Sequence, residues 1–563
     1  DEKSMRARYT LADFYRRLGK NQQAEAEYAQ ITNIAPKEVN SWLALGNFYA
    51  AINRPEDAEK QFQKTVEVDP KRISSLIHLG NFYLAWGKKE KAVETYQKGI
   101  KIDSKDIPVK ARLAEVYLNE KKYAETKEII DEILKVNPKS HEGMLLRGRL
   151  HVLKGELNEA IASLQPYLKE NPKSAMGHYL LGLAHLGNRD VQQAKAELAE
   201  AATLNPAWID PKMTLADLNL KTGAFDPAID GTQEILKLDP KSTPAHLILG
   251  NAYLGKGNFP KAGSEFEEVI RLAPNNPLGY YHRGRTLLAE RKPKEALAQF
   301  EKALALQPNF LDAITYIAAV HLNQKENKKA VERMEAQVKT SPQNPYYYNL
   351  LGRIYEVNKE EAKAEASFRK ALEINPSIPS FYISLGNFFV RSNKTGKAIE
   401  EYNGAIQKNP NSLPAYMGMG MVYELQKKFD KAKECYQKVL KISPGFPPAA
   451  NNLAYLMVEA GENVDEALAL AQEARRQVPD DPNIADTLGW VFYHKNVFNT
   501  AITYLQEASE KLKDNPAIHY HLGMAHQKNG NKELAARELS TALKIDPNFP
   551  GADKAKMALK ELK

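Results

Sequence analysis

Cysteine is almost absent from this sequence of 563 residues, in which Cys435 is the single thiol. A single cysteine excludes disulfide bonds within the chain, so such bonds contribute nothing to its fold. Cys435 stands beside Tyr436 in the run Lys-Glu-Cys-Tyr, and we interpret it as an inert packing residue. One thiol is compatible with both the cytoplasm and the periplasm.

Long apolar runs and catalytic motifs are also missing. No apolar stretch approaches the ~18 residues of a membrane-spanning helix, so we expect no transmembrane segment. The sequence contains no His-Glu-x-x-His motif, no cysteine pair and no Gly-x-x-x-x-Gly-Lys phosphate loop. The densest histidine group, His519, His521 and His526, does not place three ligands on one helical face. We therefore predict no catalytic residue, no cofactor site, no metal site and no enzymatic activity.

Neither sign of charge dominates the chain. Its 78 basic and 70 acidic residues leave a net charge of +8. Lysine and glutamate alternate along most segments, which is typical of solvated helix faces with supporting ion pairs. A nucleic-acid groove needs basic residues clustered with aromatic residues on one face, and the sequence has no such cluster. We expect no nucleic-acid partner.

A 34-residue period dominates the sequence. Alanine recurs at this step from Ala58 to Ala432, and only Thr126 interrupts the run. Glycine or alanine stands twelve residues before each of these positions, and proline usually stands twelve residues after it. The step slips by one residue near Asn463 and resumes at Ala467. A fixed period of this length indicates stacked units that bury their apolar faces against their neighbours.

Each period predicts two helices. Over residues 40–70 the apolar positions of a first helix are Trp42, Leu45, Gly46 and Tyr49, and those of a second are Ala58, Phe62 and Val66. The small side chains at Gly46 and Ala58 let the two helices approach closely. Pro70 ends the second helix, because proline cannot continue it and disfavours helical geometry in the preceding residue.

This pattern resembles the tetratricopeptide repeat, whose Trp-x2-Leu-Gly-x2-Tyr, Ala, Phe and Pro positions match Trp42, Leu45, Gly46, Tyr49, Ala58, Phe62 and Pro70. The resemblance covers nearly the whole chain and implies an all-α, right-handed superhelical α-solenoid of about sixteen helix-turn-helix units. The predicted repeats start near residues 5, 39, 73, 107, 141, 175, 209, 243, 277, 311, 345, 379, 413, 447, 482 and 516. They form one continuous array over residues 1–549, followed by a capping helix over 550–563.

In the tetratricopeptide family the first helix of each repeat lines a concave groove. The position after the periodic glycine therefore supplies the predicted peptide-binding residues, which are Asn47, Asn81, Arg149, Asn251, Arg285, Arg353 and Asn387. An asparagine amide can pair with a peptide unit, and arginine favours carboxylates or carbonyls. A similar asparagine ladder clamps extended peptides in some long arrays of the family. The alternative is a wet inner surface without a dedicated ligand, because Leu183, Ala319 and Met421 interrupt the series.

Tyrosine is common between residues 280 and 423. Tyr280, Tyr348, Tyr382 and Tyr416 occupy the position of Trp42, so we expect them in the core. Tyr281, Tyr346 and Tyr347 are additional. Rigid aromatic rings with a polar tip are good interface anchors and also stack on sugars. We predict these three as an aromatic contact surface.

Taken with the family resemblance, these features predict a non-catalytic scaffold that binds peptide segments or helices of other proteins. Segments 451–454, 486–490 and 519–523 resemble the C-terminal repeats of bacterial tetratricopeptide proteins encoded with exopolysaccharide-export and exosortase (PEP-CTERM) systems. That resemblance implies a role in envelope assembly or exopolysaccharide export. It also implies a periplasmic or outer-membrane-associated location, with a lipid anchor upstream of this chain.

Two other functions and one other location stay open. The array is alternatively the substrate-selecting arm of a larger enzyme such as a glycosyltransferase, and the cytoplasm is the alternative compartment. A scaffold that binds polysaccharide directly is the second alternative, with the additional tyrosines as stacking platforms. A large domain beyond the last residue favours the enzyme arm, whereas a signal peptide before the first favours the envelope scaffold.

Overall fold

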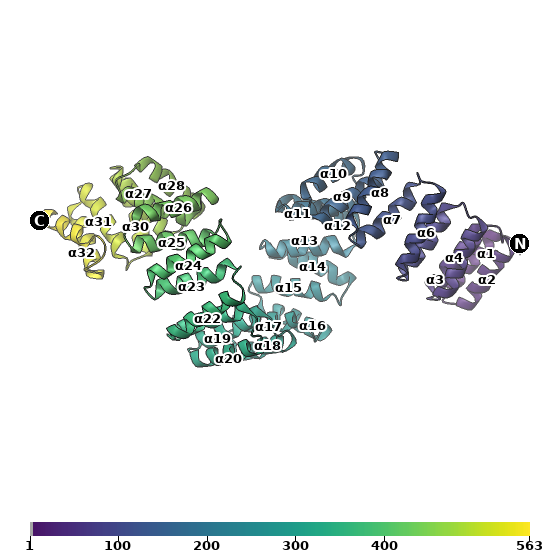
Figure 1. Cartoon of the computed structure of the whole chain (residues 1–563), viewed down its shortest axis with the longest axis horizontal. Coiled ribbons are helices and arrows are strands. Elements are labelled where there is room, and N and C mark those ends of the chain that lie inside the picture. Colours follow the sequence, from purple (N-terminus) through teal and green to yellow (C-terminus); the bar gives the residue numbers. More distant parts are fainter. Residues whose placement is uncertain (1–3, 563) are drawn as a thin grey trace. The chain divides into compact units, whose positions relative to one another are not determined.

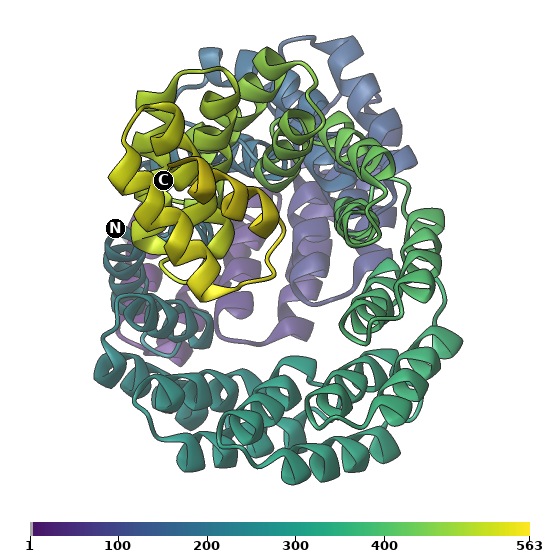
Figure 2. The same cartoon turned by 90° about the vertical axis from the view of Figure 1, so that its left-hand side faces the viewer.

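The computed structural model describes residues 4–562. Over that range the chain forms 33 helices and no β-strand. Two compact units make up the chain, Asp1–Arg291 and Lys292–Lys563. In each unit, helices that follow one another in the sequence pack side by side in chain order (Figure 1, Figure 2). The all-α solenoid predicted from the period is therefore confirmed.

The first unit consists of eight helix pairs and one further helix. The first helices are α1 (Met5–Arg17), α3 (Val39–Ala51), α5 (Ile73–Ala85), α7 (Ile107–Asn119), α9 (His141–Lys154), α11 (Ala175–Gly187), α13 (Ile209–Lys221), α15 (Thr243–Gly255) and α17 (Pro277–Ala289). The second helices are α2 (Asn21–Ile34), α4 (Pro55–Val68), α6 (Lys89–Ile102), α8 (Tyr123–Val136), α10 (Leu157–Glu170), α12 (Val191–Leu204), α14 (Phe225–Leu238) and α16 (Phe259–Leu272).

The second unit begins with a second helix, α18 (Pro293–Leu306). Its first helices are α19 (Leu311–Asn323), α21 (Pro345–Val357), α23 (Pro379–Arg391), α25 (Leu413–Leu425), α27 (Pro447–Glu459), α29 (Pro482–His494) and α31 (Pro516–Lys528). Its other second helices are α20 (Asn327–Thr340), α22 (Glu361–Ile374), α24 (Thr395–Lys408), α26 (Phe429–Ile442), α28 (Val464–Gln477), α30 (Phe498–Lys511) and α32 (Lys532–Ile545). The last helix is α33 (Ala552–Leu562).

Close contact between the two helices of a repeat explains the periodic small residues. A Cβ atom added at Gly386 would lie 2.8 Å from Cε1 of Tyr402, so a ring of the second helix already fills that space. At Ala114, one of the positions where alanine replaces this glycine, the facing residue is the smaller Ile130. The periodic alanines of the second helices, such as Ala58, are fully buried. The period therefore encodes the packing between helices.

A residue with left-handed backbone geometry follows the end of each first helix within two positions. These residues also recur with the period; examples are Asn53 with φ 59°, Gly87 with φ 71° and Lys121 with φ 59°. A residue in this region reverses the chain and stops the helix. Glycine adopts it without strain, whereas a lysine does so at a cost of about 1–2 kcal/mol. The tight turn aligns the second helix antiparallel to the first.

The final helix, α33, covers the end of the last pair. Ala552, Ala555 and Ala558 are buried in a core cluster with residues of α31 and α32. On its other side Met557 is 63% exposed. None of the helices over residues 4–562 is long and apolar enough to span a bilayer.

Candidate partner-binding groove

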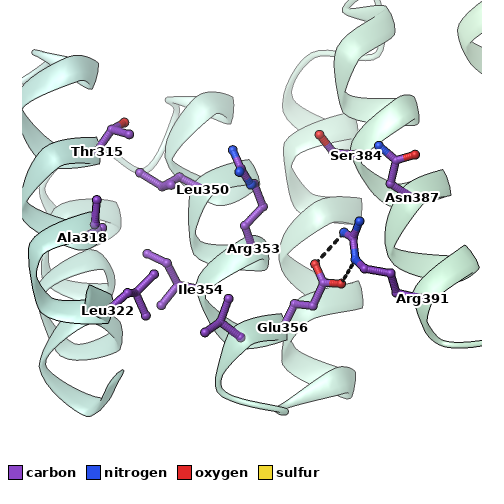
Figure 3. A pocket seen from close by; sticks show the side chains of 12 residues that line it. Thr315, Ala318, Leu322, Leu350, Arg353, Ile354, Glu356, Ser384, Asn387 and Arg391 are labelled. Carbon is purple, nitrogen blue, oxygen red and sulfur yellow. Dashed lines mark hydrogen bonds and ion pairs between the residues drawn. The ribbon is translucent and has the colours of Figure 1, made fainter. Parts of the chain in front are cut away.

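A hollow of about 630 Å³ lies on the first helices of three successive repeats, α19, α21 and α23 (Figure 3). The residues that line it are Thr315, Ala318, Ala319, Leu322, Leu350, Arg353, Ile354, Glu356, Val357, Ser384, Asn387 and Arg391. Aliphatic side chains come mainly from α19 and α21, and the polar ones mainly from α21 and α23. We call this set of residues the polar hollow.

First helices also line a hollow in the first unit. It measures about 270 Å³ and is formed by α5, α7, α9 and α11. Arg112, Glu115 and Arg149 supply charged groups there. The guanidinium of Arg149 donates a hydrogen bond to Oδ1 of Asn119 at 3.0 Å. Of the predicted binding residues, Arg149 lines this hollow, and Arg353 and Asn387 line the polar hollow.

A buried tyrosine orients the amide of Asn387 in the polar hollow. The hydroxyl of Tyr402, fifteen residues later on α24, donates to Oδ1 of Asn387 at 2.6 Å. Burial raises the pKa of Tyr402 to about 12, so the hydroxyl keeps its proton at neutral pH. Because the oxygen of the amide is occupied, its NH2 group remains to donate to a ligand.

The same interaction occurs in a repeat of the first unit. The hydroxyl of Tyr96 donates to Oδ1 of Asn81 at 2.7 Å, and the sequence separation is again fifteen. At Asn47, which is exposed, the residue fifteen positions later is Phe62, which has no hydroxyl to donate. A tyrosine fifteen residues after the asparagine is the signal that would have separated oriented members of the series from the others.

Among the residues that the structure describes, Arg353 is the positive charge of the polar hollow that has no partner. Its side chain is exposed, and no residue in the range 4–562 forms an ion pair or hydrogen bond with its guanidinium. The other arginine there, Arg391, bridges α23 to α21 by a bidentate ion pair with Glu356, in which Nη2 lies 2.8 Å from Oε2 (Figure 3). This hydrogen bonding raises the pKa of Arg391. The pair is neutral, so an anionic ligand would meet Arg353.

Asn251 and Arg285, by contrast, bond to each other. Nη1 of Arg285 lies 3.3 Å from Oδ1 of Asn251 and 3.1 Å from Nδ1 of His282. The amide nitrogen of Asn251 donates to the carbonyl of Leu247 at 2.8 Å. Burial, with a smaller effect of Arg285, lowers the pKa of His282 to about 3, so its ring is neutral and can accept a hydrogen bond. The fold itself uses these two predicted binding residues.

The three additional tyrosines separate into two kinds. The side chain of Tyr346 is 44% exposed, and its ring packs edge-on against Phe381 with centroids 5.2 Å apart. Tyr281 is half-buried, with its ring 4.9 Å from that of His282. Tyr347, however, is fully buried.

Our prediction of Tyr347 as a contact residue is therefore wrong. Its hydroxyl donates to the carbonyl of Pro308 at 3.0 Å, in the turn before the preceding repeat. Helix α21 begins at Pro345, so successive residues point in different directions around the helix axis. Tyr346 faces solvent, and Tyr347 faces the neighbouring repeat.

The position of Trp42 is also less buried than the sequence suggested. Trp42, Tyr348, Tyr382 and Tyr416 are all half-buried. The indole nitrogen of Trp42 donates to the carbonyl of Pro36 at 2.9 Å, and the hydroxyl of Tyr382 donates to that of Pro376 at 3.1 Å. This position therefore ties the start of a repeat to the turn before it and is not a purely apolar core position.

Histidine takes this position in three repeats, and the sequence reading overlooked its partners. Nδ1 of the ring lies near a glutamate nineteen residues later, and Nε2 lies near the carbonyl of the preceding turn. The pairs are His178 with Glu197 at 2.6 Å, His246 with Glu265 at 2.6 Å and His519 with Glu538 at 2.7 Å. These histidines join the two helices of one repeat.

No metal-binding arrangement accompanies the groove in the described part of the chain. Among residues 4–562 no group of three His, Cys, Asp or Glu side chains is placed to hold a metal ion. Cys435 is buried, and burial raises the pKa of its thiol to about 11. A thiol of this kind is a poor nucleophile, because the thiolate is the reactive form.

Models of tetratricopeptide repeats match this chain along most of its length. They match residues 6–38, 39–72, 73–106, 112–175, 145–208, 213–277 and 497–559. A model described as the N-terminal ARM repeat of tetratricopeptide repeat protein 21 matches residues 251–462. The chain is thus a helical repeat protein, and it belongs to the tetratricopeptide repeat superfamily.

Individual relatives are distant. The TPR repeat-containing protein PA4667 of Pseudomonas aeruginosa is 33% identical over 75 residues, which is 13% of this chain and 12% of that protein. The chain therefore matches only a small part of that curated relative.

Solved structures that it resembles are the Cut9–Hcn1 hetero-tetramer of APC/C, Naa15/Naa10 bound to HypK-THB, and yeast Tom70. The first shares 17% identity at TM-score 0.38, over 87% of this chain and 96% of that one. The second shares 14% identity at TM-score 0.33, over 99% of this chain and 96% of that one. The third shares 16% identity at TM-score 0.40, over 78% of this chain and 99% of that one.

Superfamily membership defines the general class of function. Tetratricopeptide proteins bind other proteins, and an architecture made of these repeats alone is typically a non-catalytic scaffold. An array of these repeats suggests a scaffold for protein–protein interactions.

Proposed function

We propose that the first helices of this scaffold hold an extended segment of a partner protein, and that the polar hollow on α19, α21 and α23 is the main contact. The observation that carries the proposal is the bond from Tyr402 to Asn387. It orients the amide NH2 in the hollow that the guanidinium of Arg353 also lines, and no described residue pairs with that guanidinium (Figure 3). A side chain whose orientation is set before binding loses less entropy when a ligand arrives.

Each part of the hollow has a matching part in a peptide. The NH2 group of Asn387 donates to a backbone carbonyl, and Arg353 donates to a carboxylate or a second carbonyl. Leu322, Leu350 and Ile354 provide apolar surface for a side chain of the segment. Nothing in this set of groups activates a nucleophile or holds a reacting atom, so the site is suited to binding alone.

Removing the hydroxyl group of Tyr402 tests this proposal. A library of random peptides is selected against the full chain, and the affinity of the selected peptides is then measured with Tyr402→Phe and Asn387→Ala. The phenylalanine keeps the ring packed but frees the amide to rotate, so we expect about fivefold to tenfold weaker binding, as for one lost hydrogen bond. Asn387→Ala should weaken binding at least as much.

The chain offers a matched control at the equivalent position of the next repeat. The hydroxyl of Tyr436 bonds to Glu424, not to a groove asparagine. Tyr436→Phe should therefore leave peptide affinity unchanged. Equal affinity of the wild type and Asn387→Ala would show that the peptide lies elsewhere.

We also propose that the scaffold acts in the bacterial envelope, in the assembly or export of exopolysaccharide, from the periplasm or the outer membrane. The support is the resemblance of segments 451–454, 486–490 and 519–523 to repeats of such systems. Fractionation of the native cell, with antibody detection of the protein, tests the location. Recovery in the cytoplasmic fraction would contradict it.

Direct binding of polysaccharide has less support from the aromatic residues than the sequence suggested. Tyr347 is buried, so only Tyr346 and the half-buried Tyr281 remain as stacking surfaces. A glycan-binding screen with the full chain and Tyr346→Ala tests this second function.

A further inference from the structure

A second hollow lies next to the polar hollow on α23 and differs from it in chemistry. It measures about 770 Å³ and lies at the starts of α23, α25 and α27. Its apolar lining comes chiefly from Ile383, Leu413, Pro414, Met417, Phe446 and Pro448, and no charged side chain lines it. We call this set the apolar hollow.

One face of α23 joins the two hollows. Ser380 and Ile383 line the apolar hollow, whereas Ser384, Asn387 and Arg391 line the polar hollow. Ser380, Ser384, Asn387 and Arg391 follow one another at steps of three to four positions, which places them on the same side of the helix, and Ile383 lies four positions before Asn387. From Ser380 to Arg391 the helix rises about 16 Å at 1.5 Å per residue. About five residues of extended chain cover that length.

The edge of this unit lacks charge where the apolar hollow opens. The turns before α19, α21, α23, α25 and α27 occupy residues 307–310, 341–344, 375–378, 409–412 and 443–446. They contain no Asp, Glu, Lys or Arg. In the first unit the turns at 35–38, 69–72, 103–106, 137–140, 171–174 and 239–242 each carry lysine, whereas those at 205–208 and 273–276 carry no charged residue. An edge without charges is dehydrated at low cost, because no ion has to leave water.

We propose that the two hollows form one docking track, and that its occupant is a protein segment with an acidic residue next to bulky apolar side chains. The acidic residue meets Arg353, which is the only arginine of the polar hollow without a partner among residues 4–562. The apolar side chains enter the apolar hollow beyond Ser384. This inference rests on the proposed function, since it places the two ends of the segment that Asn387 holds.

The track predicts the composition of the bound segment. Arg391 is already neutralised by Glu356, so one acidic residue satisfies the polar end. Burial of one large apolar side chain is the main interaction at the other end, and its loss corresponds to about tenfold or more in affinity. A segment of basic residues would place like charge against Arg353 and should not bind.

The experiment uses the full chain and a displayed library of random twelve-residue peptides. Enriched peptides are synthesised, labelled and titrated against the wild type, the Asn387→Ala variant described above and four further variants. Ser380→Glu and Pro414→Glu place a charge at exposed positions of the apolar hollow. Arg353→Gln removes the charge of the polar hollow. Gln437→Glu, at an exposed position of α26, adds the same charge away from both hollows.

We expect the enriched peptides to share an acidic residue within about five positions of a bulky apolar one. Ser380→Glu, Pro414→Glu and Arg353→Gln should each weaken them about tenfold, and Gln437→Glu should not. The first three substitutions fall at exposed positions, and unchanged circular dichroism confirms that each variant is folded. Agreement of the two glutamate variants guards against a local effect of either one.

Other outcomes overturn the inference in distinguishable ways. If Arg353→Gln and Asn387→Ala weaken the peptides but both glutamate variants bind normally, the apolar hollow is not part of the track and the proposed function stands. If no peptide responds to Asn387→Ala or Arg353→Gln, both proposals fail. If light scattering shows a wild-type dimer that Ser380→Glu dissociates, a second copy of the chain covers the apolar hollow.

Discussion

A methyl group added at Gly80 should clash with the ring of Tyr96. The new Cβ would lie 2.3 Å from Cε1 and 2.7 Å from Cζ of that ring. Tyr96 is fully buried, so its ring has no free space into which to move. At the equivalent Gly46 the same methyl would lie 3.2 Å from Cε1 of Phe62, a contact that a shift of a few tenths of an ångström relieves.

Gly80→Ala and Gly46→Ala are the same substitution at equivalent positions of two repeats, but these distances predict different effects on stability. Alanine in place of helical glycine contributes about 1 kcal/mol of stability at either position. Overpacking in a dense core costs about 1–3 kcal/mol, and the shorter distance at Gly80 points to the upper end. Gly80→Ala should therefore destabilise α5 and α6 by about 1–2 kcal/mol. Gly46→Ala should lie between neutral and a gain of about 1 kcal/mol in α3 and α4.

Hydrogen exchange of the native full chain measures this difference locally. Repeats contact only their neighbours, so each substitution acts mainly on its own helix pair. A difference of about 2 kcal/mol corresponds to roughly a thirtyfold difference in the opening equilibrium. Amides of α5 and α6 in Gly80→Ala should exchange faster than in the wild type, and those of α3 and α4 in Gly46→Ala should not.

A rescue substitution checks the cause. The chain itself pairs Ala114 with Ile130 at the equivalent positions. Adding Tyr96→Ile to Gly80→Ala should therefore cost less than the two single changes together, with a coupling of about 0.5–3 kcal/mol. Equal protection in Gly46→Ala and Gly80→Ala, or strict additivity with Tyr96→Ile, would refute the steric reasoning.

Three further predictions concern single side chains. The hydrogen bond to Glu538 raises the pKa of His519 above 6.5, and the nearby charge of Asp514 raises it further. The carboxylate of Glu538 also forms an ion pair with Arg537. The contribution of the His519–Glu538 pair to the stability of α31 and α32 should be complete below about pH 6.5 and decline as the pH rises through the folded pKa of His519. An NMR titration giving a pKa of 6.5 or less for His519 would contradict this. Cys435 should react with a maleimide only when the chain unfolds, because burial raises its pKa to about 11; rapid labelling of the native chain would show otherwise. Tyr347→Phe should destabilise α21 by about 1 kcal/mol, whereas Tyr346→Ala should have little effect. If calorimetry showed the larger loss of stability for Tyr346→Ala, the assignment of Tyr347 as buried and Tyr346 as exposed would be wrong.

Much of the fold follows from the sequence because repeat packing is local. Gly46, Ala58 and Phe62 must meet within a single helix pair, so their spacing indicates both helices and the contact between them. The left-handed residue that follows each first helix, such as Asn53, recurs with the same step. Interactions over such short separations leave a regular trace in the sequence. The position of the groove on the first helices follows from the family resemblance.

Tertiary structure alone decided which of the predicted binding residues are available to a partner. Tyr346 and Tyr347 are adjacent in sequence, yet one is exposed and the other donates to the carbonyl of Pro308 in an earlier turn. The bond between Asn251 and Arg285 joins two repeats. Helical periodicity determines the face on which a side chain lies, but its partner depends on what the neighbouring repeat places opposite it.

The apolar hollow shows the same limit. Ile383, Met417 and Phe446 come from three repeats or the turns between them, and each is unremarkable in its own helix. Their common surface exists only because α23, α25 and the start of α27 meet in the stacked repeats. The sequence by itself determined the repeating helix pair, since that depends on contacts within a repeat. The stacked structure decided the binding surface, since that surface is shared among repeats.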